Sequence, residues 1–168
     1  VYIMGGEKVG RYALYIATLG NRPDLFGGRP LTPTLYDIPE SYLSDETFAA
    51  MMAEAEKYIG YPYVWGGSSP TTSFDCSGFV SWVINHSGWN VGRLGAQGLC
   101  NICTPVSAAN VRPGDLVFFV GTYDTPGVSH CGLYVGDGWM LHCGDPISYA
   151  NLNTSYWQSH FYAYGKLF

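Results

Sequence analysis

Apolar residues recur at helical spacing in two stretches of the chain. The first predicts a helix over residues 45–59, with Ser44 or Asp45 as its N-terminal cap. The apolar stripe of this helix consists of Phe48, Met51, Met52, Ala55 and Ile59. The second stretch predicts a helix over residues 76–86, which is apolar almost all round. A helix of that kind is expected to be buried.

Strand-like segments follow in the second half of the chain. We expect strands over residues 116–120, 129–135 and 139–143, and an edge strand over residues 161–167. Polar loops are predicted over residues 68–73, and a long irregular region over residues 87–110. Two helices followed by several strands predict an α+β domain, with helices packed on an antiparallel sheet.

Residues 1–43 differ in composition from the rest, because glycine and proline interrupt them frequently. A short helix is predicted over residues 10–19, and a loop over residues 21–40. The segment has too few apolar residues for a core of its own. We therefore expect an N-terminal arm or linker over residues 1–43 that wraps the next domain, and one catalytic domain over residues 44–168.

The predicted hairpin around Gly136-Asp137-Gly138 restricts which side chains share a sheet face. A two-residue turn would put His130 and His142 on opposite faces. A three-residue loop with Gly138 in the left-handed conformation pairs Val135 with Trp139 instead, and separates polar from apolar positions. One face then carries His130, Tyr134, Met140 and His142. The apolar face carries Cys131, Leu133, Val135, Trp139, Leu141 and Cys143.

Composition narrows the function. The chain of 168 residues is 47% hydrophobic, 16% aromatic and only 12% charged, with a net charge of -5. No basic cluster is present to displace counterions, which argues against a nucleic-acid partner. No apolar run is long enough for a membrane span. Many tyrosines and few charges suggest a cleft for sugars or peptides. The chain begins with Val and shows no signal peptide, so we expect a fragment of a longer protein.

The chemistry centres on Cys76, which lies where the second helix should begin. A thiol at a helix N-terminus is placed at the positive end of the helix dipole, which favours the thiolate. His130 and His142 arrive later on strands and could act as base and orienting residue. The combination predicts a cysteine hydrolase that needs no metal or cofactor.

Four further cysteines leave alternatives open. Cys100 and Cys103 form a C-x-x-C pair, which alone is a weak zinc signal. The hairpin register places Cys131 opposite Cys143, which leaves a disulfide between them as one alternative. Counted with Cys100 and Cys103, the two thiols would also complete a four-ligand zinc site, which is the second alternative. A buried pair of inert thiols is the simpler expectation, and Cys76 is expected to lie apart from all four.

Four motifs in order resemble those of the NlpC/P60 family of cell-wall cysteine peptidases. The motifs are Tyr63-Val64-Trp65-Gly66-Gly67, Asp75-Cys76-Ser77-Gly78-Phe79-Val80, Arg112-Pro113-Gly114-Asp115-Leu116-Val117-Phe118-Phe119 and Ser129-His130-Cys131-Gly132-Leu133-Tyr134-Val135-Gly136. The resemblance covers residues 45–167 and is greatest to the peptidase domain of two-domain Gram-positive and mobile-element enzymes. It implies a papain-like fold, a secreted or wall-associated location, and a lysozyme-like domain upstream in the full protein.

The resemblance also implies a reaction: hydrolysis of the γ-D-glutamyl bond to meso-diaminopimelate or L-lysine in a peptidoglycan stem peptide. Cys76 would be the nucleophile, His130 the base and His142 the third, orienting member. Tyr63 would contact the thiolate or the oxyanion, and the substrate would be bound by Asp75, Ser77 and Trp65. Two other functions compete with this one. The first is an amidase or acyltransferase on the same scaffold, and the second is a non-catalytic module that binds the cell wall.

Each candidate has a simpler structural explanation as well. His142 could be a packed core histidine, and Tyr63 a packed strand tyrosine. Asp75 could serve only as a helix cap, and Ser77 only as a first-turn residue. The motifs alone do not decide between these explanations, because they depend on which side chains meet in the folded chain.

Overall fold

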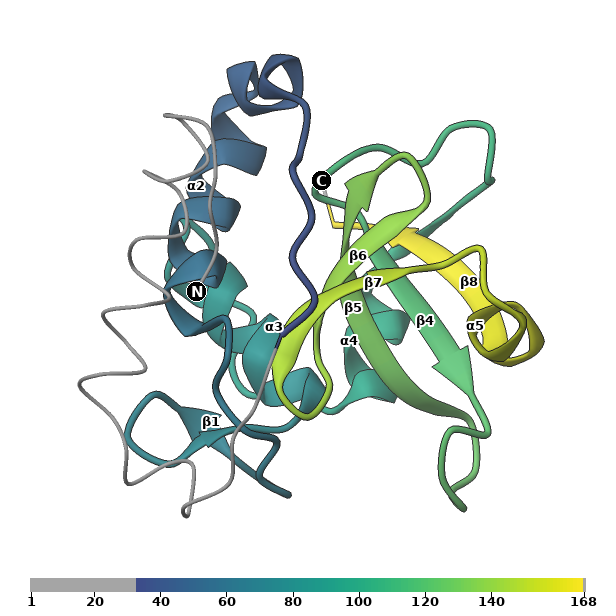
Figure 1. Cartoon of the computed structure of the whole chain (residues 1–168). Coiled ribbons are helices and arrows are strands. Elements are labelled where there is room, and N and C mark those ends of the chain that lie inside the picture. Colours follow the sequence, from purple (N-terminus) through teal and green to yellow (C-terminus); the bar gives the residue numbers. More distant parts are fainter. Residues whose placement is uncertain (1–32, 168) are drawn as a thin grey trace.

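The computed structural model describes residues 33–167, which form helices packed against a six-stranded antiparallel sheet (Figure 1). The helical elements are η2 (Glu40–Ser44), α2 (Glu46–Ala55), η3 (Glu56–Tyr58), α3 (Cys76–Asn85), α4 (Ala96–Ile102) and α5 (Ser155–His160). The strands are β1 (Ser68–Ser69), β2 (Ser73–Phe74), β3 (Thr104–Val106), β4 (Leu116–Val120), β5 (Val128–Gly136), β6 (Trp139–Cys143), β7 (Ile147–Asn151) and β8 (Phe161–Lys166). Within these residues, no helix has both the length and the apolarity to cross a bilayer.

The two predicted helices and the central strands are confirmed. Asp45 caps α2 by accepting a hydrogen bond from the backbone N–H of Phe48. Other expectations are wrong: the region 87–110 contains α4 and β3, and the loop 68–73 contributes to a small hairpin of β1 and β2. The last strand, β8, is not an edge strand, because the sheet order is β3-β8-β4-β5-β6-β7.

The connection between β5 and β6 is shorter than predicted. Gly136 pairs with Trp139 across a two-residue turn, and the register shifts between Tyr134 and Gly136. This irregularity leaves Val135 as an extra residue, so that Tyr134 still pairs with Met140 as expected. The predicted face assignment is therefore confirmed, although a bulge rather than a three-residue loop produces it.

The two faces of the sheet carry separate apolar clusters. The larger cluster joins α2 and α3 to one sheet face, which includes Leu116, Phe118, Cys131, Leu133, Leu141 and Cys143. The smaller cluster lies on the other face and includes Val117, Phe119, Tyr134, Met140 and Leu152, with Trp157 of α5 packed against it. Helices thus cover both faces, and the candidate site lies where α3 begins beside β5.

Residues 33–44 pack against the rest of the described chain. Ile38 is 1% exposed in the main cluster, and the ring of Tyr36 stacks on Trp139 with centroids 4.5 Å apart. The Tyr42 hydroxyl donates to Asp137 in the β5–β6 turn at 2.8 Å. The predicted helix over residues 10–19 lies outside the described residues, and the boundary at residue 43 stays a prediction.

Candidate active site

Cys76 is the first residue of α3, and Asp75 is its N-terminal cap. One carboxylate oxygen of Asp75 accepts from the backbone N–H of Gly78 at 2.7 Å, and the other accepts from that of Gly66 at 3.1 Å. The cap satisfies an N–H that would otherwise lack a partner in the first turn. It also ties the Gly66-Gly67 loop to the start of α3, so the position of the thiol is determined by backbone contacts.

Two glycines of the motifs allow this close approach. The backbone N–H of Asp75 donates to the carbonyl of Gly67 at 2.9 Å. A Cβ at Gly78 would overlap the same Gly67 carbonyl oxygen, and a Cβ at Gly67 would lie 2.5 Å from the carbonyl oxygen of Ser73. Only glycine fits at either position, because the neighbouring atoms belong to the backbone and cannot move aside.

His130 and His142 meet on one face of the sheet, as the parity argument predicts. Nε2 of His130 lies 2.8 Å from Nδ1 of His142, and the two rings are nearly perpendicular, at 84°. Burial lowers the pKa of His142 well below its usual value, and the neighbouring His130 lowers it further. His142 therefore stays neutral and can accept a hydrogen bond from Nε2–H of His130 at Nδ1.

The Cys76 thiol is buried, and several groups act on its ionisation. The largest effect is that of the neighbouring Cys131 thiol, which lowers the pKa of Cys76 by hydrogen bonding. Burial raises the pKa, and the hydrogen bond and charge of His130 lower it. The balance is a pKa of about 5. Sγ of Cys76 lies 3.9 Å from the carbonyl oxygen of Ser129. The expectation that Cys76 lies apart from the other thiols is wrong, because helix and strand meet where Cys131 faces α3.

Trp157 is a site residue that the sequence reasoning missed. Its ring stacks on His130 with centroids 5.5 Å apart and 23° between planes, and it meets the ring of His142 edge-on at 5.2 Å. The same ring packs on Phe119 at 4.7 Å. Trp157 thus covers both histidines from α5. Its place there depends on tertiary packing, since no spacing in the sequence links residue 157 to residues 130 and 142.

Two cavities adjoin the thiol and the histidines. The larger, of about 490 Å³, is lined by both histidines and by Tyr156, Trp157 and Asp145. The smaller, of about 310 Å³, is lined by the thiol and by Asp75, Ser77 and Arg93. Both are also lined by Tyr63, Trp65, Tyr123 and Ser129. Together the two cavities form one cleft, with Cys76 in the wall of one part and His130 in the wall of the other.

Tyr63 and Trp65, two predicted site residues, lie on this cleft. Burial raises the pKa of Tyr63 well above its usual value, and the nearby Cys76 and Asp75 raise it further, so the phenol stays protonated and can donate. Trp65 is 71% exposed, and its ring meets that of Tyr123 edge-on at 5.3 Å. These aromatic rings form the rim of the cleft.

Asp75 and Ser77 also meet on the cleft, together with a partner that the sequence did not reveal. Arg93 donates from one guanidinium nitrogen to both carboxylate oxygens of Asp75, at 2.9 and 3.1 Å. Its other terminal nitrogen donates to the Ser77 hydroxyl at 3.0 Å. The helix cap is thus part of a charged, hydrogen-bonding wall of the cleft, and Asp75 does more than cap the start of α3. Arg93 lies in the region predicted to be irregular, where the sequence showed no spacing to follow.

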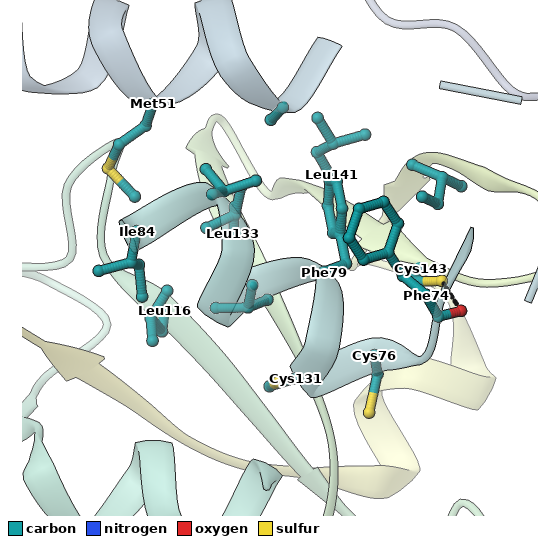
Figure 2. Close-up of a cluster of buried hydrophobic side chains, with 14 of the residues drawn as sticks. Met51, Phe74, Cys76, Phe79, Ile84, Leu116, Cys131, Leu133, Leu141 and Cys143 are labelled. Carbon is teal, nitrogen blue, oxygen red and sulfur yellow. Dashed lines mark hydrogen bonds between the residues drawn. The ribbon is translucent and has the colours of Figure 1, made fainter. Parts of the chain in front are cut away.

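The other cysteines form neither a disulfide nor a metal cluster. All five cysteines of the chain are free thiols. Cys143 donates to the carbonyl oxygen of Phe74 at 3.2 Å, which gives this buried thiol a backbone partner (Figure 2). Among residues 33–167, no group of three or more histidine, cysteine or acidic side chains is placed to hold a metal ion. The disulfide and zinc alternatives are therefore wrong for this structure.

Comparison with known proteins places this geometry in a family. The NlpC/P60 family model matches residues 60–166. The bifunctional muramidase/DL-endopeptidase CwlT of Bacillus subtilis is 41% identical over 125 residues, which cover 74% of this chain and 38% of that protein. The γ-DL-glutamyl hydrolase of Bacillus subtilis is 39% identical over 111 residues, covering 65% of this chain and 27% of that protein.

A solved structure agrees with this assignment. An NLP/P60 family protein from Staphylococcus aureus, described as similar to a lipoprotein, superposes with a TM-score of 0.71 at 40% identity. The match covers 81% of this chain and 44% of that one, so this chain spans less than half the length of each of these three relatives. The chain belongs to the NlpC/P60 family and has the papain-like α+β fold that its helices and antiparallel sheet display.

Proposed function

We propose that the chain is a cysteine peptidase that hydrolyses the γ-D-glutamyl–diamino acid bond of peptidoglycan stem peptides. The observation that carries the proposal is the placement of Cys76 at the start of α3, with its sulfur 3.9 Å from the carbonyl oxygen of Ser129, next to His130 on β5. His130 is itself paired with His142 at 2.8 Å. The names of the relatives, a DL-endopeptidase and a γ-DL-glutamyl hydrolase, support the choice of bond.

The first step is attack of the Cys76 thiolate on the carbonyl carbon of the γ-glutamyl bond. The sulfur–carbon bond forms while the carbonyl π electrons move to oxygen. The backbone N–H of Cys76 is free of an intrahelical partner at the first position of α3 and can donate to this oxyanion. The protonated Tyr63 hydroxyl is the second candidate donor. A donor of this kind contributes about 2.7–4 kcal/mol in comparable sites.

His130 then handles the protons. As the tetrahedral intermediate collapses, the imidazolium gives a proton to the departing amine, and the acyl group remains on Cys76 as a thioester. A water molecule next attacks the thioester while His130 takes its proton, which releases the γ-carboxylate and restores the thiolate–imidazolium pair. Neutral His142 accepts from Nε2–H of His130 throughout, so it holds the ring that carries the proton.

The same steps assign the two cavities to the two halves of the substrate. The departing amine must lie beside His130, so the diamino acid occupies the cavity lined by Tyr156 and Trp157. The acyl half then extends into the cavity lined by Asp75, Ser77 and Arg93, whose polar groups would bind the end of the stem peptide. Aromatic rims at Trp65 and Tyr123 would cover the bond being cleaved.

We also infer the wider setting from the relatives. The chain spans 38% of the length of the muramidase/DL-endopeptidase relative, so it would act as the peptidase part of a longer protein with a lysozyme-like domain upstream. Its substrate lies in the cell wall, which places the working enzyme outside the cell, secreted or attached to the wall. The steps above require no metal, cofactor or nucleic-acid partner.

The test is digestion of purified peptidoglycan by the wild-type chain and by Cys76→Ala. Walls containing meso-diaminopimelate and walls containing L-lysine are digested separately, and the products are analysed by mass spectrometry. The proposal predicts fragments that end in D-glutamate, and a free α-amino group on the diamino acid, from the wild type only. Release of L-alanine amines would indicate an amidase, and exchanged acyl groups a transferase. Sedimentation with the wall without new amines would indicate a binding module.

A further inference from the structure

Asp145 is a carboxylate on the histidine side of the cleft that the proposed mechanism does not use. It lies in the turn between β6 and β7, three residues after His142. Together with both histidines it lines the cavity of about 490 Å³. Among the residues that the structure describes on this wall, Asp145 is the only acidic side chain, and none is lysine or arginine.

Hydrogen bonds to a distant segment hold the turn that carries Asp145. The backbone N–H of Gly60 donates to the carbonyl oxygen of Ile147 at 2.9 Å, and the N–H of Ile147 donates to that of Tyr61 at 2.8 Å. One carboxylate oxygen of Asp145 accepts from the backbone N–H of Tyr63 at 3.1 Å. The carboxylate is therefore fixed against the segment that leads to the rim of the cleft. A carboxylate has about four acceptor positions, so the bond to Tyr63 is compatible with a further bond from an ammonium group.

We propose that Asp145 determines which diamino acid the chain accepts, by binding the ammonium group at the end of its side chain. The inference rests on the proposed function, in which the diamino acid occupies the cavity beside His130. The side chain of the diamino acid starts on the carbon that bears the departing amine, so it lies in the same cavity as the carboxylate of Asp145. An ammonium that meets a carboxylate there forms a charge-assisted hydrogen bond.

The charges on this wall favour L-lysine over meso-diaminopimelate. The side chain of L-lysine ends in one ammonium group, whereas that of meso-diaminopimelate ends in an ammonium and a carboxylate on the same carbon. Asp145 would repel this second carboxylate, and like charges placed together disfavour binding. The proton of the His130 imidazolium is committed to the departing amine. Amidation removes the negative charge of that carboxylate, so amidated meso-diaminopimelate should be accepted as well.

The test compares soluble stem peptides that differ only at the diamino acid: L-lysine, Nε-acetyl-L-lysine, meso-diaminopimelate and amidated meso-diaminopimelate. The wild type is expected to cleave the L-lysine peptide with a kcat/KM about tenfold above that of the acetylated and the free meso-diaminopimelate peptides, because these lose a hydrogen bond between charged groups. Asp145→Asn keeps the size and an acceptor for the Tyr63 N–H but lacks the charge, so both ratios should fall to about twofold or less.

The matched control removes a different acid near the cleft. Asp124 is exposed in the loop between β4 and β5 and lines neither cavity. Asp124→Asn changes the net charge by the same amount as Asp145→Asn. It should keep the wild-type ratios, because its effect on an ammonium in the cavity is screened by solvent.

A purely structural role for Asp145 predicts a different result. Ratios that are the same in Asp145→Asn and in the wild type overturn the inference, and so does a wild type that prefers free meso-diaminopimelate to L-lysine. Calorimetry with Cys76→Ala and with Cys76→Ala/Asp145→Asn gives the same comparison as ratios of Kd, without cleavage. Failure of the proposed function is distinguishable, because it appears as a wild type that cleaves no peptide or as cleavage that persists in Cys76→Ala, whatever the ratios of Kd.

Discussion

His130 and His142 form a hydrogen-bonded pair of 2.8 Å between neighbouring strands, and a bulge at Val135 allows them to share a sheet face. If His142 orients His130, then His142→Ala should lower kcat about a hundredfold, because the imidazole loses its preferred tautomer and direction. His142→Asn, which retains an acceptor, should recover part of the loss. Both are measured as amine release from a soluble stem peptide.

The control for this prediction is another histidine. His86 is exposed, stacks on Trp82 at 3.8 Å, and lies away from the cleft at the end of α3. His86→Ala should leave kcat within about twofold of the wild type. Equal kcat values for His142→Ala and the wild type would show that His142 is only a packed core residue.

Trp157 should support the same pair from α5. Trp157→Ala removes the ring that stacks on His130 and meets His142 edge-on, so water gains access to their hydrogen bond. We expect kcat to fall about tenfold, and Trp157→Phe to restore most of it because the aromatic face remains. Steady-state kinetics measure the effect, and unchanged kcat in Trp157→Ala would exclude this role.

Arg93 should act mainly on substrate binding. It is hydrogen-bonded to both Asp75 and Ser77, the two residues expected to contact the acyl half of the substrate. Arg93→Ala should raise KM about tenfold, the worth of one hydrogen bond to a charged group, with a smaller change in kcat. The exposed Lys57, paired with Glu54 at 2.9 Å, provides a control in Lys57→Ala. A fall in kcat at unchanged KM would instead mean that Arg93 serves the nucleophile.

Two glycine-to-alanine substitutions should have opposite effects on stability. A Cβ at Gly78 would overlap the Gly67 carbonyl oxygen, so Gly78→Ala should lower the free energy of unfolding by about 3 kcal/mol. A Cβ at Gly98 in α4 would meet Leu94 at 3.4 Å, near ordinary contact, so Gly98→Ala should stabilise by up to about 1 kcal/mol. Urea unfolding measures both. A neutral Gly78→Ala would show that the loop and α3 can move apart.

The pH dependence of kcat/KM should show the ionisation of Cys76. Its pKa is lowered to about 5, chiefly by the hydrogen bond with Cys131 and, against the effect of burial, by His130. The thiolate is the reactive form, so activity should be retained above pH 5 and should fall about tenfold per pH unit below it. A soluble stem peptide assayed from pH 4 to 10 tests this. A limb near pH 8 or 9 would indicate an unperturbed thiol.

Much of the site could be predicted because its residues are tied to local patterns. A cysteine after a capping aspartate begins an apolar helix, and helix capping depends on a few neighbouring residues. That His130 and His142 share a face was predicted from the separation of polar and apolar positions in the hairpin. The three-residue loop expected to produce it was wrong, because a bulge at Val135 restores the pairing across a two-residue turn. The glycines around the cap were readable as motif residues, although the backbone contacts that require them were not.

The remaining features depended on contacts between distant segments. Helix α4 and strand β3 were missed because short elements in a Gly- and Asn-rich stretch have weak local signals, and tertiary packing stabilises them. Arg93, Trp157 and Cys131 join the site from three separate segments, and no periodicity connects them to Cys76. The nucleophile, its helix and the shared face of the two histidines were readable from the chain alone, because capping and alternation are local rules. The surroundings of the thiolate were not, because burial and hydrogen bonding there depend on how α3, β5 and α5 pack together.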